Sequence, residues 1–184
     1  MNTAIKIFKA FSPPILVSAI KNSSLIKSGW HGNFKTWEEA RSKTTGYDSA
    51  LILEKVRDSV SRVKEGHSVY ERDSVLFDTI QYSWPLLTGL MMAAATDGGK
   101  INVLDFGGSL GSTYYQNKKF LAHFNDVVWS IVEQEHFVNI GKKSFEDSIL
   151  KFYPTITDCI KEQSPNVIVL SSVLQYLENP YYFI

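Results

Sequence analysis

The sequence has only one cysteine, Cys159, among its 184 residues. A disulfide within the chain needs two cysteines, and a zinc site built on several thiolates needs more. The sequence therefore excludes both, and we expect Cys159 to be a small, buried, apolar side chain. The four histidines do not have the spacing of zinc ligands, so we expect no metal site; they are His31, His67, His123 and His136.

The sequence also lacks an excess of either charge, because 19 Lys and Arg residues balance 19 Asp and Glu residues. Domains that bind nucleic acid usually carry a basic surface, so we expect no nucleic-acid partner. Hydrophobic residues make up 44% of the chain and charged residues 21%, which is typical of a globular domain.

Long apolar runs are missing as well. None approaches the roughly 18 residues that a membrane-spanning helix needs. The nearest stretch, residues 11–20, is broken by Pro13 and Pro14, and this break also makes it a poor secretory signal. We therefore expect a cytoplasmic protein.

Acidic residues are absent from the first 37 positions, which hold five lysines among apolar side chains. Residues 1–35 are therefore interpreted as a basic N-terminal arm. One interpretation is an arm packed on its own domain. The other is peripheral contact with an anionic surface such as the inner membrane.

Residues 36–99 are predicted to be a helical region. The stretch 36–39 forms a capping box, in which Thr36 is the N-cap and Glu39 reaches back to its amide. A third helical segment is expected to start near Asp73. Pro85 interrupts it, so we expect there either a kink or a fresh helix start with Ser83 as the cap. The second helical segment lies between the capping box and Asp73 and ends at a glycine. It has an apolar stripe at Ile52, Val56, Val60 and Val63.

Strands and helices are predicted to alternate over residues 100–184. Strands are expected at 101–106, 127–132, 150–153 and 166–170, with helices at 112–123, 136–143 and 155–162. This alternation predicts an α/β fold, a Rossmann-like, mainly parallel sheet of about four strands with helices on both faces. The predicted domain organisation is a helical N-terminal region followed by this sheet.

A glycine-rich turn follows the first of these strands. In open α/β sheets, ligands bind beyond the carboxyl ends of the strands. A phosphate-binding P-loop would need a Gly-Lys pair, which is absent, and a dinucleotide fingerprint starting at Gly107 lacks two of its three glycines. An S-adenosylmethionine motif fits best, with Ser109 in place of its middle glycine and Gly108 supplying similar freedom. The predicted cofactor-binding residues here are Asp105, Gly107, Gly108, Ser109 and Gly111.

Three further segments are expected to meet this turn. Glu133 ends the second strand, where a carboxylate can accept both ribose hydroxyls. Ser171 and Ser172 follow the fourth strand, beneath the expected methionine end of the cofactor. Tyr115 begins the helix after the turn and is a candidate for contact with the methionine carboxylate.

The sequence resembles a family of class I, Rossmann-like methyltransferases found among bacterial surface-polysaccharide genes, such as O-antigen and capsule clusters. The resemblance implies S-adenosylmethionine as cofactor and a sugar or lipid-linked sugar as acceptor. The segments that carry it are GWHGNFKTWEEA at 29–40, GYD at 46–48, ERDSVLFD at 71–78, VLDFGGSLGSTYYQ at 103–116, IVEQ at 131–134 and VLSSVLQYLENP at 169–180.

The chain departs from this family in one respect, because complete domains of the class have seven strands and only four are expected here. The later strands are then either missing or supplied by a partner chain. That partner could be a second copy of the same chain, in a homo-oligomer. Candidates for catalysis are His31, Asp73 and Gln175. Two alternatives stay open: a nicotinamide-dependent sugar-modifying enzyme and a non-catalytic cofactor-binding module.

Overall fold

The computed structural model describes residues 32–43 and 50–183, and the chain divides into two compact units between Thr44 and Thr45. The first unit contains the short helix α3 (Trp37–Ser42). Thr36 is its N-cap, and its hydroxyl accepts from the Glu39 amide at 3.1 Å. The Glu39 carboxylate accepts from the Lys35 amide at 3.1 Å, one residue before the expected partner. Of the expected basic arm, only 32–35 lie among the described residues.

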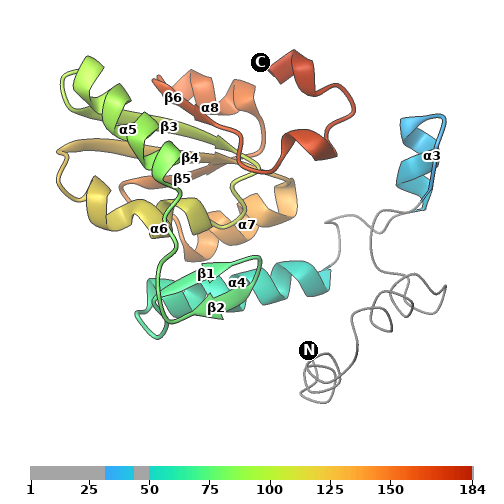
Figure 1. Cartoon of the computed structure of the whole chain (residues 1–184), viewed down its shortest axis with the longest axis horizontal. Coiled ribbons are helices and arrows are strands. Elements are labelled where there is room, and N and C mark those ends of the chain that lie inside the picture. Colours follow the sequence, from blue (N-terminus) through green and yellow to red (C-terminus); the bar gives the residue numbers. More distant parts are fainter. Residues whose placement is uncertain (1–31, 44–49, 184) are drawn as a thin grey trace, which may run out of the picture. The chain divides into compact units, whose positions relative to one another are not determined.

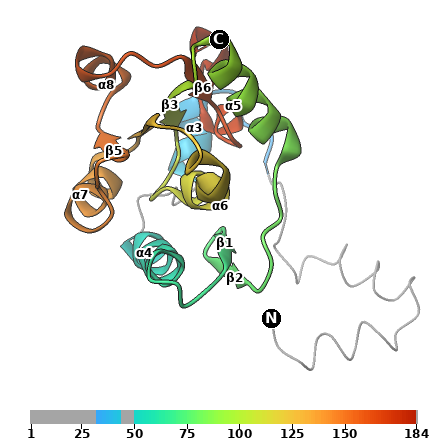
Figure 2. The same ribbon diagram turned by 90° about the vertical axis from the view of Figure 1, so that its left-hand side faces the viewer.

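The second unit contains all the other elements of the described residues (Figures 1 and 2). In chain order they are α4 (Ala50–Lys64), β1 (Tyr70–Arg72), β2 (Val75–Phe77), α5 (Trp84–Thr96), β3 (Lys100–Phe106), α6 (Ser112–Leu121), β4 (Asp126–Val132), α7 (Glu135–Ser144), β5 (Leu150–Tyr153), α8 (Ile156–Glu162), β6 (Val167–Val169) and two 3₁₀ helices, η1 (Leu174–Tyr176) and η2 (Pro180–Phe183).

Four parallel strands form the central sheet in the order β5-β4-β3-β6. Helices α6 and α7 lie on one face and α8 lies on the other (Figures 1 and 2). Helices α6 and α7 each return the chain to a neighbouring parallel strand, whereas α8 carries it from β5 to β6 at the opposite edge of the sheet. The α/β fold class is therefore confirmed, and the sheet is that of an incomplete Rossmann-like fold.

The core lies against both faces of β3 and β4. Trp129, Tyr114 and Phe152 are buried in the larger cluster, which the apolar stripe of α4 joins through Val60. A smaller cluster contains Leu104, Val132, Tyr153 and Cys159. Cys159 is completely buried, as expected for a small apolar residue. The apolar segments of the sequence thus position the strand ends that carry the site.

A β-hairpin replaces the helix that was expected to start near Asp73. Strands β1 and β2 pair antiparallel, and the rings of Tyr70 and Phe77 lie 5.8 Å apart. Asp73 and Ser74 both have positive φ, 51° and 63°, which is the geometry of a two-residue hairpin turn. The prediction was wrong because Asp-Ser is a weaker hairpin signal than Asn-Gly, although Asp tolerates the left-handed region.

One further expectation is confirmed and one boundary differs. A fresh helix start at Pro85 is observed, because Ser83 is the N-cap of α5 and Pro85 lies in its first turn. The strand expected at 166–170 pairs with β3 on one side only, through Val167–Val169, and Ile168 is 64% exposed. The apolar run at 166–170 therefore forms a shorter strand than expected, at one edge of the sheet. None of the described helices has the length and apolar character needed to cross a bilayer.

Candidate cofactor site at the glycine turn

The chain reverses sharply between β3 and α6. Gly107, Ser109 and Gly111 have positive φ of 74°, 56° and 99°, and Gly108 does not. The Gly107 amide donates to the Val132 carbonyl at 2.9 Å, which joins the turn to the end of β4. Ser109 itself therefore takes the left-handed conformation that glycine adopts readily, and the expectation that Gly108 would supply this freedom was wrong.

A Cβ on any of the three glycines would crowd a different neighbour. A Cβ on Gly107 would lie 2.7 Å from Val173, so it would meet the loop after β6. A Cβ on Gly108 would lie 2.6 Å from the Asp105 carboxylate, and one on Gly111 would lie 3.2 Å from Leu150. The contacts at Gly107 and Gly108 are shorter than real Cβ atoms show and the one at Gly111 is tight, so the turn packs closely on its surroundings.

Asp105 is a buried acid beneath the turn, with only 1% of its surface exposed. Its carboxylate accepts from the indole nitrogen of Trp129 at 3.0 Å. Burial raises the pKa of Asp105 to about 7, while the bond from Trp129 opposes this shift and the charge of Glu133 adds to it. Asp105 therefore keeps its proton to a higher pH than an exposed aspartate does.

Glu133 lies at the end of β4 and is bound to the turn. Its carboxylate accepts from the Gln134 amide at 2.7 Å and from the Ser109 amide. Partial burial raises its pKa, and these amides and the charge of His136 oppose the rise. The carboxylate is therefore held in a fixed orientation beside the turn, where the sequence predicted a ribose contact.

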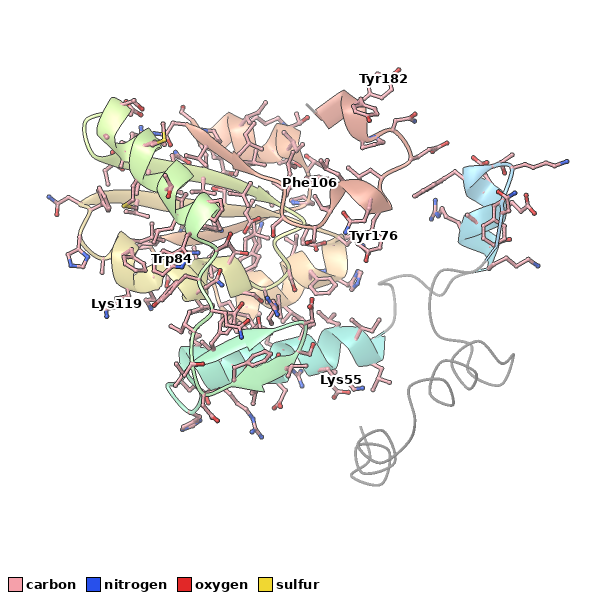
Figure 3. The ribbon with its side chains drawn as sticks, in the orientation of Figure 1. Lys55, Trp84, Phe106, Lys119, Tyr176 and Tyr182 are labelled. Carbon is pink, nitrogen blue, oxygen red and sulfur yellow. The ribbon has the colours of Figure 1, made fainter. Side chains whose placement is uncertain are left out.

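The loop after β6 reaches the same end of the sheet. Val173 faces Gly107, and the Gln175 side chain donates to the Ser172 carbonyl at 2.8 Å. Ser171 and Ser172 are both exposed. Phe106, the last residue of β3, and Tyr176 also lie at this end (Figure 3). The three predicted segments, the turn, the end of β4 and the loop after β6, are thus brought together.

The other predicted residues differ in their positions. The Tyr115 amide donates to the Gly111 carbonyl of the turn at 2.9 Å, but its ring packs on Tyr114 with ring centres 5.1 Å apart, and burial raises its pKa. Asp73 is exposed at the tip of the hairpin. His31 lies outside the described residues. Among the candidates for catalysis, only Gln175 is placed at the edge of the candidate site by its neighbours.

Sequence analysis missed one acid near the turn. Glu71 of β1 is 3% exposed, and it accepts a hydrogen bond from the hydroxyl of Ser112, the first residue of α6. The Ser74 amide donates to its other oxygen at 3.3 Å. Burial raises the pKa of Glu71, and its bonds to serines oppose the rise. In a strand, buried and exposed side chains alternate, so a strand at 70–72 would have predicted a buried Glu71 beside an exposed Arg72. The sequence analysis expected no strand there, and Glu71 was therefore missed.

A groove of about 440 Å³ lies elsewhere, between α4 and the hairpin. Its charged side chains form exposed pairs, Arg57 with Glu54 and Arg62 with Asp58. Such pairs contribute little binding specificity because water and salt screen them. Among the described residues, no three His, Cys, Asp or Glu side chains gather to hold a metal ion.

Comparison of the chain with protein-family models, with curated proteins and with solved structures gives no significant match. The function is therefore inferred from the residues of the chain and their geometry.

Proposed function

We propose that the chain is an S-adenosylmethionine-dependent methyltransferase whose cofactor binds along the glycine turn, residues 105–111. The observation that carries this proposal is the meeting of the tight turn, the fixed carboxylate of Glu133 and the loop after β6 at the carboxyl end of parallel strands. Ligands of open α/β sheets bind at this edge.

The charges beside the turn favour this cofactor over a dinucleotide. Asp105, Glu133 and Glu71 surround the turn, and none of them forms an ion pair with Lys or Arg among the described residues. S-adenosylmethionine carries a positive sulfonium and an ammonium group, whereas a dinucleotide carries a pyrophosphate. The ionised fraction of these carboxyl groups attracts the first and repels the second, whereas a ribose contact at Glu133 is common to both cofactors.

Each residue has a stated task in this proposal. Glu133 accepts the ribose hydroxyls, because its oxygens are already oriented by two amides. Asp105 supports the turn from below through Gly108. The loop of Ser171 and Ser172 lies against the turn through Val173, and Gln175 lies where an acceptor would approach. When bound, the cofactor supplies an electrophilic methyl group, and the protein aligns the acceptor with it.

The acceptor is proposed to be a sugar or lipid-linked sugar of surface-polysaccharide synthesis. Its support is the family resemblance of the segments at 29–40, 71–78, 103–116 and 169–180. The proposed location is the cytoplasm, with peripheral contact at the inner membrane through the basic arm.

Calorimetry with S-adenosylhomocysteine and with NADH tests the cofactor. We expect binding of the first only, and Glu133→Gln to weaken it by about 1.5–3 kcal/mol, since a hydrogen bond to a charged group is lost. Glu135→Gln is the matched control, because Glu135 is an exposed acid two residues away. Unchanged affinity in Glu133→Gln would remove Glu133 from the site, and binding of NADH alone would favour the nicotinamide-dependent alternative.

A further inference from the structure

Glu71 is a buried carboxylate without a cationic partner. It is 3% exposed, and no ion pair of the described residues includes it. Burying an ionisable side chain is costly unless a specific interaction keeps it in place. Here both oxygens are bound, one by Ser112 and the other by the Ser74 amide, so the acid is held in one position.

That position is the first turn of α6. The hairpin lies beside α4 and below α6 in both views, and β1 contacts both helices (Figures 1 and 2). Ser112 is the first residue of α6, and among the described residues no acceptor bonds to the amides of Ser112, Thr113 or Tyr114. Free amides and the positive end of a helix attract phosphate, which is how many nucleotide-binding folds hold their ligands. The Glu71 carboxylate lies one hydrogen bond away from this turn.

We propose that Glu71 is a specificity-determining residue, whose carboxylate at Ser112 excludes phosphate groups from the first turn of α6 and restricts the glycine turn to a cofactor without phosphate. The inference rests on the proposed cofactor site and names the feature that selects its ligand. The glycine spacing alone does not decide between S-adenosylmethionine and a dinucleotide. The proposal assigns this choice of ligand to a residue of β1, outside the central sheet. Specificity of this kind acts by repelling the wrong ligand.

The test uses inorganic pyrophosphate as a probe of the first turn, measured by calorimetry on the full chain. We expect the parent to bind it at least about tenfold more weakly than Glu71→Gln, since one like charge at a helix N-terminus is removed. Gln keeps an oxygen for Ser112 and has nearly the same shape. Asp73→Asn is the matched control, because it removes a charge from the same hairpin at an exposed position. We expect it to bind pyrophosphate as the parent does.

Equal pyrophosphate affinity in the parent and in Glu71→Gln would overturn the proposal, and so would an equal gain in Asp73→Asn, which would indicate a bulk charge effect. A second measurement needs no variant. Amide NMR of the parent should show no shift at Ser112 to Tyr114 on addition of pyrophosphate, and a clear shift there would overturn the proposal. If S-adenosylhomocysteine fails to bind while Glu71→Gln still gains pyrophosphate affinity, the cofactor proposal fails and the role of Glu71 is supported.

Discussion

Gly108→Ala should destabilise the protein strongly, although Gly108 has ordinary φ. The new Cβ would lie 2.6 Å from the Asp105 carboxylate, which is buried and bound to Trp129 at 3.0 Å. Forcing a methyl group into such a site costs roughly 1–3 kcal/mol. Displacing the carboxylate from Trp129 adds roughly 1–3 kcal/mol for the buried groups left without partners. The sum is about 2–6 kcal/mol, which at about 2–4 °C per kcal/mol lowers the melting temperature of a chain of this size by roughly 4–24 °C.

Thermal unfolding followed by circular dichroism measures this loss. Gly89→Ala is the matched control, because Gly89 lies within α5 and a Cβ there has nothing within 4 Å. Alanine should stabilise that helix by about 0.5–1 kcal/mol. If Gly108→Ala melts within a degree of the parent, the carboxylate yields freely, and the account of a rigid acid beneath the turn is refuted.

Two further substitutions probe the same turn. Asp105→Asn should remove a pH dependence of the folding stability. The folded parent keeps the Asp105 proton up to about pH 7, whereas the unfolded chain releases it near pH 3.8. The stability of the parent therefore falls as the pH rises between these two values. Urea unfolding should show the parent losing roughly 2–3 kcal/mol relative to Asp105→Asn between pH 5 and 8, and parallel profiles would contradict the raised pKa. Ser109→Gly should remove the backbone strain at φ 56°, which costs the parent about 1–2 kcal/mol. The greater chain entropy of unfolded glycine should cancel about half of this gain, so the variant should be slightly more stable than the parent. A melting temperature clearly below that of the parent would show that the Ser109 side chain contributes more than its backbone strain costs.

Much of the sheet is predictable from the sequence because its strands are short apolar runs between turn residues. The run that became β3 and the acid-ended run that became β4 give both the parallel pairing and the positions of Asp105 and Glu133. The hairpin was missed because its turn is Asp73-Ser74, whose left-handed conformation is visible only in the backbone.

The neighbours that decide the site were harder to predict. The spacing of the glycines does not predict that Val173 lies against Gly107, because Val173 belongs to a loop 66 residues later in the chain. Similarly, Trp129 is expected in the core as an aromatic strand residue, but its bond to Asp105 requires the register in which Asp105 pairs with Ile131. Contacts between distant segments follow from tertiary packing, which local patterns do not contain.

The order of pairing in the sheet has a consequence for how the molecule assembles. β3 meets β4 across a separation of 26 residues, Lys100 with Asp126, but meets β6 across 64, Val103 with Val167. Closing the longer loop costs about 0.8 kcal/mol more in chain entropy. We therefore expect β6 to dock after the β3–β4–β5 sheet has formed. Because Val173 of the following loop closes over Gly107, the glycine turn would gain its last wall only in this final docking step.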